Sequence, residues 1–150
     1  MKNRGISGDR VESLFDRVDY LIDAHPKKLF LMIGINDING GRTAEAVVRD
    51  ITRLIDMWRS GAPGTTIYVQ SILPQNEDMR PKAAEYVDVV LKANEEIKKL
   101  CQERGIMYID LHPILADGEG KLAAPYTLDG LHLTGEGYLR WADHIREYVK

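Results

Sequence analysis

The sequence has 150 residues, of which 44% are hydrophobic and 29% are charged, and its net charge is −3. This length suits a single domain over residues 1–150, and the composition is that of an ordinary globular protein. The weak negative charge offers no basic surface for nucleic acid, and no run approaches the ~18 apolar residues that a membrane-spanning helix needs.

Hydrophobic patterns alternate between helix and strand along the first half of the chain. Apolar residues at helical spacing predict one helix within residues 10–23, with Asp9 as its cap and Glu12 in the capping-box position. Residues 29–33 form a short apolar run that is typical of a strand covered on both faces. Thr43 is then expected to cap a second helix.

The second half continues the alternation. Residues 66–71 and 106–110 predict two further strands. A helix is expected between them, from about residue 83 to residue 104, and Gly105 is expected to end it. The last helix is expected to turn four side chains inward, those of Tyr138, Trp141, Ile145 and Val149.

This order of elements, α-β-α-β-α-β-α, predicts an α/β fold in which helices cover a parallel sheet. In such sheets, functional groups gather in the loops at the carboxyl ends of the strands. Three segments take this place in the sequence: "GIND" after the first strand, "SILPQNED" after the second, and a long loop after the third that reaches "DGLH".

The segment "DGLH" sets Asp129 and His132 three residues apart across a glycine turn. An aspartate at this spacing can accept a hydrogen bond from the imidazole Nδ1–H, which leaves Nε2 free to act as a general base. The alternative is a surface turn with an incidental histidine, because D-x-x-H also occurs by chance.

Two other segments carry groups that could bind a negatively charged oxygen. The Asn36 amide follows the first strand and can donate a hydrogen bond to developing negative charge. Gly5 and Gly8 flank a loop that leads into the first helix, where backbone N–H groups favour an anion. Each segment could equally be an ordinary turn.

The sequence gives no reason to expect a metal or another cofactor. Asp110 and His112 could suggest a metal site, but no third ligand of suitable spacing is evident. The single cysteine, Cys101, falls on the buried side of a helix, so a packed thiol is expected there.

In this order, "NRGISGD", "GIND" and "DGLHLTGEGY" resemble the signature blocks of the SGNH hydrolases, the GDSL-type lipases and esterases. The sequence is similar to bacterial members related to the platelet-activating-factor acetylhydrolase catalytic subunit and to carbohydrate O-acetylesterases. The resemblance implies a flavodoxin-like three-layer α/β/α sandwich and ester hydrolysis without a metal. It also implies that Asp129 and His132 are the acid and base of a triad, and that Gly8 and Asn36 form the oxyanion hole.

The sequence departs from the family pattern at the nucleophile. The family's first block, a strand that ends in G-D-S with the nucleophilic serine, precedes the glycine block, and no G-D-S occurs in these 150 residues. The resemblance therefore implies that the first strand and helix of the sheet are missing too. Open sheet edges of this kind would invite a homodimer.

Three hypotheses account for this departure. The chain is a fragment or a mis-started reading frame of an esterase, and is inactive alone; or it is a non-catalytic relative that binds an ester or an acetylated sugar; or Ser7 or Ser71 has replaced the nucleophile. In each case the partner is a small-molecule ester, and acetyl is the acyl group that the resemblance favours. A nucleotide-binding protein is disfavoured because neither GxGxxG nor GxxxxGK[ST] occurs. The first residues lack the apolar core of a signal peptide, but the missing block leaves the compartment open.

Overall fold

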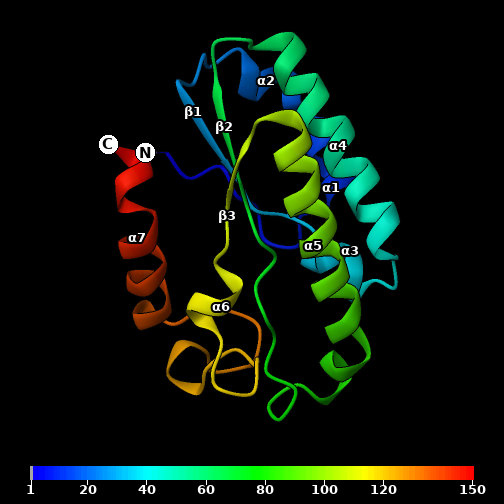
Figure 1. Ribbon diagram of the computed structural model, residues 1–150, viewed down its shortest axis with the longest axis vertical. Helices are drawn as coiled ribbons and strands as arrows, with labels where there is room; N and C mark the ends of the chain where they lie inside the picture. The colour runs from blue at the N-terminus through cyan, green and yellow to red at the C-terminus, as the bar shows by residue number, and fades with distance from the viewer. Residues whose placement is uncertain (1) are drawn as a thin grey trace.

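A parallel three-stranded sheet forms the centre of the computed structural model, which describes residues 2–150 (Figure 1). The strands β1 (Lys28–Leu31), β2 (Thr66–Gln70) and β3 (Met107–Ile109) lie in the order β1-β2-β3. All three expected strands are therefore present, with ends that differ from the prediction by one or two residues.

Helices cover both faces of the sheet, which confirms the expected α/β/α layers (Figure 1). One face carries α1 (Val11–Phe15), α2 (Val18–Ile22), α4 (Ala44–Gly61) and α5 (Val87–Arg104), the last preceded by the 3₁₀ turn η1 (Pro81–Tyr86). The other face is covered by α7 (Gly135–Val149). No helix within residues 2–150 is both long enough and apolar enough to cross a membrane.

Three short helical segments follow the carboxyl ends of the strands, where the sequence predicted loops. They are α3 (Ile35–Asn39) after β1, α6 (His112–Leu115) after β3, and the 3₁₀ turn η2 (Ala124–Tyr126). The predicted Thr43 cap of α4 and the end of α5 at Gly105 are confirmed, whereas α5 begins at Val87, later than the predicted start near residue 83, because η1 precedes it. The Thr43 Oγ1 accepts a hydrogen bond from the Ala46 N–H at 3.3 Å, and Gly105 ends α5 with a φ of 62°.

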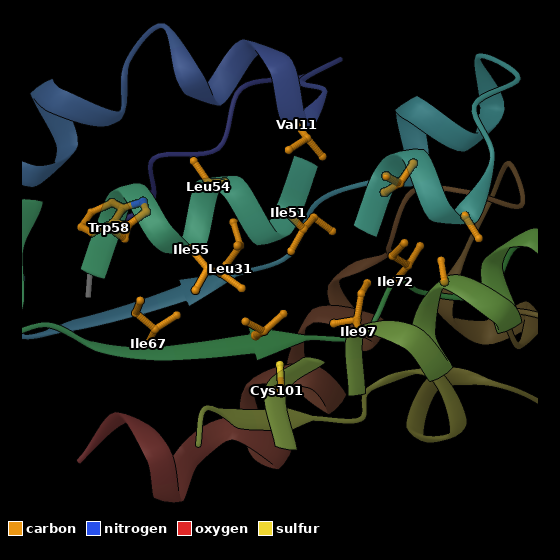
Figure 2. Close-up of a cluster of buried hydrophobic side chains, with 14 of the residues drawn as sticks. Val11, Leu31, Ile51, Leu54, Ile55, Trp58, Ile67, Ile72, Ile97 and Cys101 are labelled. Atoms are coloured by element: carbon orange, nitrogen blue, oxygen red, sulfur yellow. The ribbon is translucent and has the colours of Figure 1, made fainter. Parts of the chain in front are cut away.

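The alternation of side chains along the strands divides the core into two clusters. Leu31, Ile67 and Val69 point toward α4 and α5 and join the larger cluster, which Figure 2 shows. Cys101 belongs to this cluster, and burial raises the pKa of its thiol to about 11, so the thiol is packed as expected. The smaller cluster, on the α7 side, centres on Ile109, Leu111 and Ile145.

The α7 side of the sheet is less buried than the sequence predicts. On this side of β1, Phe30 is only partly buried, because β1 is an edge strand and a single helix covers it; Leu31, the one buried residue of β1, faces the other side. Tyr138 and Val149 are 56% and 39% exposed, so the prediction that they face inward is wrong. Instead, α7 contacts the sheet through a narrower stripe, in which Tyr148 meets the Tyr68 ring edge-on.

The helix predicted within residues 10–23 is broken into α1 and α2. Arg17 leaves the helical region with a φ of −128°, and its guanidinium pairs with Asp9 and donates to the Arg4 carbonyl at 3.0 Å. Asp9 therefore does not cap α1 as predicted. Its carboxylate instead accepts a hydrogen bond from the Ile6 N–H at 3.2 Å.

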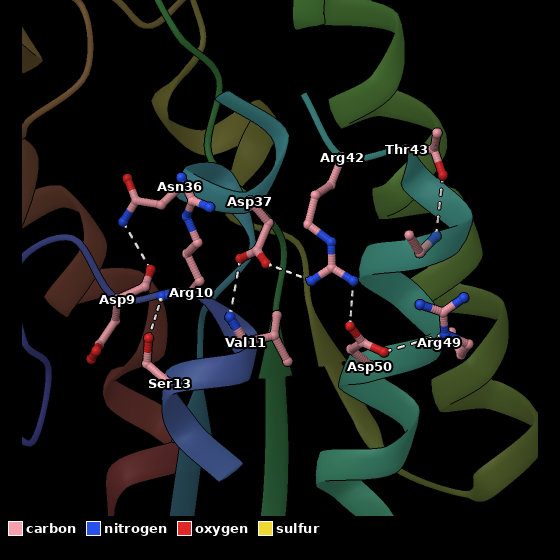
Figure 3. Close-up of polar contacts among 11 residues, drawn as sticks. Asp9, Arg10, Val11, Ser13, Asn36, Asp37, Arg42, Thr43, Arg49 and Asp50 are labelled. Atoms are coloured by element: carbon pink, nitrogen blue, oxygen red, sulfur yellow. Dashed lines mark hydrogen bonds and ion pairs between the residues drawn. The ribbon is translucent and has the colours of Figure 1, made fainter. Parts of the chain in front are cut away.

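The cap of α1 comes from Asp37, a fully buried residue of α3. Its Oδ2 accepts a hydrogen bond from the Val11 N–H at 3.0 Å, and its Oδ1 accepts one from the Arg42 guanidinium at 2.9 Å (Figure 3). Arg42 also pairs with Asp50 of α4. One carboxylate thus joins α1, α3 and α4 at the carboxyl end of β1.

Replacing Asp37 with alanine should lower the free energy of unfolding by about 3 kcal/mol, because the buried Val11 N–H and Arg42 both lose an acceptor. Urea unfolding of parent and variant measures this change. Asp143→Ala is the matched control, since Asp143 pairs with Arg146 on the exposed surface, and its unfolding midpoint should stay that of the parent. Equal midpoints for both variants would show that Asp37 does not organise this region.

Candidate active site

The turn that carries Asp129 and His132 is held by its own side chains. Thr127 is buried, and its Oγ1 accepts a hydrogen bond from the Gly130 N–H at 2.9 Å. Gly130 has a φ of 79°, in the left-handed region that favours glycine. The Asp129 Oδ1 accepts hydrogen bonds from the N–H groups of Leu131 and His132 at 2.9 and 2.8 Å. The backbone of the turn is therefore fixed without any ligand.

The structure brings the Asp129 and His132 side chains into contact. The Asp129 Oδ2 lies 2.6 Å from the His132 Nδ1, so a neutral ring with its proton on Nδ1 leaves Nε2 as an acceptor. The hydrogen bond to His132, together with those from the two backbone N–H groups, lowers the pKa of the Asp129 carboxyl. Both side chains are open to solvent, with exposed fractions of 74% for His132 and 51% for Asp129.

The two candidate oxyanion donors also lie together. The Asn36 Nδ2 donates to the Asp9 carbonyl at 2.9 Å, which joins α3 to the loop that contains Gly8 (Figure 3). Gly8 has a φ of 81°, and within residues 2–150 its N–H makes no hydrogen bond. Asn36 has a second amide hydrogen to donate. Two donors from separate segments are therefore available side by side.

A cleft of about 300 Å³ opens where these segments meet. Gly8, Asn36 and Leu131 all contribute to its wall. Because Leu131 directly precedes His132, the turn with the Asp129–His132 pair borders the cleft that both donors line. Gly8 and Asn36 thus line one cleft, whereas Asp129 and His132 lie on the turn at its border and are not themselves among the lining residues.

Of the two candidate serines, Ser71 has contacts that do not fit an attacking nucleophile. Ser71 is fully buried, and its Oγ accepts hydrogen bonds from the N–H groups of Leu111 and His112, both at 2.8 Å. These contacts give Ser71 a structural role at the start of α6 and argue against the hypothesis that it attacks a substrate. Ser7 is exposed in the Gly8 loop but is not among the residues that line the cleft.

Metal ligation has no support in the described part of the chain. Within residues 2–150, no group of three or more His, Cys, Asp or Glu side chains could hold a metal ion. His112 lies at the start of α6, where burial lowers the pKa of its imidazole.

Two arginines that the sequence analysis did not single out also line the cleft. Arg10 follows the Gly8 loop, and Arg80 lies in the loop after β2. The available signal was that Arg10 directly follows the glycine loop and that Arg80 lies near the loop predicted after the second strand. That signal is weak, because arginine is common on any protein surface.

His132→Ala should raise the pKa of the Asp129 carboxyl toward the ordinary value of 3.8, because the ring hydrogen bond is its largest stabilising contact. In the parent this pKa is lower in the folded than in the unfolded chain. The ionised carboxylate therefore stabilises the folded chain at pH values above the unfolded pKa of 3.8. This stabilisation is lost as the pH falls through the lower pKa of the folded chain. Carbon-13 NMR of the carboxyl through an acid titration measures both midpoints, and an unmoved midpoint in the variant would contradict the pairing.

Ser71→Ala should lower the free energy of unfolding by about 2 kcal/mol, because the N–H groups of Leu111 and His112 lose their acceptor. The exposed Ser7→Ala serves as the control and should unfold like the parent. Both are measured by urea unfolding. If the two variants are equally stable, the structural role given to Ser71 is wrong.

Comparison with known proteins supports the predicted resemblance. The chain matches the GDSL-like Lipase/Acylhydrolase family over residues 1–140. It is 26% identical over 149 residues to the platelet-activating factor acetylhydrolase IB subunit alpha2 of Homo sapiens, a match that covers 98% of this chain. The chain spans 63% of the length of that relative.

Solved structures share the fold. A protein from Streptococcus pneumonia named as a platelet activating factor superposes with a TM-score of 0.87 at 28% identity, over 99% of this chain and 72% of that one. A GDSL-like lipase from Bacteroides thetaiotaomicron superposes with a TM-score of 0.86 at 22% identity, over 97% of this chain and 73% of that one. The second likeness shows the fold alone, whereas the family match extends over most of the sequence. The chain belongs to the GDSL-like lipase/acylhydrolase family.

Proposed function

We propose that this chain supplies the general base and the oxyanion hole of a serine ester hydrolase. Membership of an acylhydrolase family supports a hydrolase role. The observation that carries the proposal is the 2.6 Å contact between Asp129 Oδ2 and His132 Nδ1, on a turn that borders the cleft lined by Gly8 and Asn36.

In the proposed reaction, a serine hydroxyl attacks the ester carbonyl carbon while His132 Nε2 takes its proton. Asp129 orients the ring and stabilises the imidazolium that forms. The Gly8 N–H and the Asn36 amide donate hydrogen bonds to the oxyanion. His132 then passes the proton to the leaving alcohol, and a water that it deprotonates releases the acid from the acyl-enzyme.

The nucleophilic serine of this proposal lies outside the 150 residues. No G-D-S occurs in the sequence, the Ser71 hydroxyl is buried against α6, and Ser7 does not line the cleft. A small acyl group such as acetyl is the favoured substrate moiety, since the human relative is named an acetylhydrolase.

A non-catalytic protein that binds an ester or an acetylated sugar is the second candidate. It is favoured by one observation, that no serine is among the residues lining the cleft. A binding protein has no need of a histidine oriented by an aspartate, however. The Asp129–His132 contact therefore favours the hydrolase.

The 150-residue chain alone should show little or no hydrolysis of p-nitrophenyl acetate, and His132→Ala should not change this rate, because triad members act as a unit. If the parent is active and the variant is not, the nucleophile lies within these residues, and Ser7→Ala becomes the next variant to assay.

When the chain is joined to an N-terminal segment that carries a G-D-S serine, His132→Ala should lower kcat about a thousandfold or more relative to the same joined protein with His132 intact. His144→Ala is the matched control, since this residue lies on α7 and outside the cleft, and its kcat should stay near that of the parent. Equal, measurable activity of His132→Ala and the parent would contradict the role given to His132, whereas no activity in either would leave the binding protein as the better candidate.

A further inference from the structure

Two arginine side chains that form no ion pair within residues 2–150 line the cleft beside the proposed oxyanion donors. They belong to Arg10 and Arg80. Arginines elsewhere, such as Arg42 and Arg104, pair with carboxylates, whereas neither Arg10 nor Arg80 forms an ion pair with any residue between 2 and 150. No acidic side chain is among the lining residues. The residues that line the cleft therefore carry only positive charge, and the nearby Asp129 carboxylate, on the bordering turn, is engaged by His132.

Arg10 is placed by its contact with the end of α3. A Cβ atom on Gly40 would lie 2.8 Å from the Arg10 Nη2 and 3.1 Å from its Cζ, so the guanidinium rests on the Gly40 backbone. Figure 3 shows the Arg10 side chain running from the start of α1 toward α3, where Asn36 lies. Gly40 and Asn36 line the same cleft, so this contact keeps the guanidinium at the cleft wall.

Arg80 is fixed against the turn that carries the catalytic pair. The Arg80 N–H donates to the Asn76 carbonyl at 2.9 Å, and the Asn76 N–H donates to the Gly130 carbonyl at 2.9 Å. A Cβ atom on Gly130 would lie 3.1 Å from the Arg80 Cβ. Arg80 therefore enters the cleft from the side of Asp129 and His132.

This side of the cleft is where the proposed reaction places the alcohol part of the ester, because His132 must protonate the leaving alcohol. A guanidinium group binds carboxylate or phosphate oxygens through paired, charge-assisted hydrogen bonds. Such contacts are stronger in a cleft than in bulk water.

We propose that Arg80 and Arg10 form an anion-binding subsite, and that the substrate is an ester whose alcohol part carries a carboxylate or phosphate group. The assignment of the anion to the alcohol part rests on the proposed function. The subsite itself rests on the two unpaired guanidinium groups and on the absence of acidic lining residues from the cleft.

Binding of three small esters to the 150-residue chain tests the subsite. Acetoxyacetate carries a carboxylate on its alcohol part, 2-acetoxyethyl phosphate carries a phosphate, and acetoxyacetamide is the neutral counterpart of the first. Titrations followed by the NMR amide signals of Gly8 and Leu131, which line the cleft, give a Kd for each. At least one anionic ester should bind tenfold or more tightly than the neutral amide, and the two anionic compounds together distinguish carboxylate from phosphate.

Arg80→Gln should remove most of this preference, and Arg10→Gln should reduce it. Arg80→Lys keeps the charge but loses the paired donors, so its preference should be intermediate. The control is Arg140→Gln, on the exposed surface of α7, which should bind like the parent. Equal Kd values for charged and neutral esters, no binding of either anion, or an Arg80→Gln variant that binds like the parent would each overturn the subsite.

This readout separates the subsite from the proposed function. If binding of the anionic esters depends on Arg80 but the chain joined to a serine-bearing segment does not hydrolyse them, the subsite stands and the hydrolase proposal fails. If hydrolysis depends on His132 while charged and neutral esters bind and react equally, the hydrolase proposal stands and the subsite fails.

Discussion

The buried carboxylate of Asp37 is the interaction on which the candidate site depends. It caps α1 through the Val11 N–H and binds Arg42, which in turn pairs with Asp50 of α4. A fully buried carboxylate requires both partners, because leaving it unpaired in a low dielectric would be costly. The same contacts place the Gly8 loop, just before α1, next to Asn36, which immediately precedes Asp37 in α3.

The other half of the site is built by a different kind of interaction. Thr127 and Asp129 bind the backbone N–H groups of their own turn, so this turn depends on hydrogen bonds between residues near in sequence. The loop after β2 then packs on Gly130 and carries Arg80 to the cleft. The contacts of Asp37 thus position Gly8 and Asn36 on one wall of the cleft, and the local turn with the loop after β2 positions Leu131 and Arg80 on another.

Sequence reasoning succeeded for the strands and for the helix ends marked by Thr43 and Gly105. It failed where the outcome depends on tertiary contacts that periodicity does not show. The three strand runs were predicted correctly, because burial repeats over many residues and tolerates a local error. The break between α1 and α2 was missed, since it depends on Arg17 reaching Asp9 and the Arg4 carbonyl. The exposure of Tyr138 was missed because periodicity shows which residues share a helix face but not how much of that face is covered.

By itself, the sequence determined the order of helices and strands, the parallel sheet, and the family, because these follow from periodicity and from three motifs. It also indicated the Asp129–His132 contact, since two residues across one tight turn have little choice of geometry. Only the tertiary structure decided that Asp37, rather than Asp9, caps α1, that Ser71 is occupied by backbone donors, and that Arg10 and Arg80 share a cleft. Each of these outcomes depends on contacts between residues far apart in the chain, which exist only once the sheet and its helices have packed.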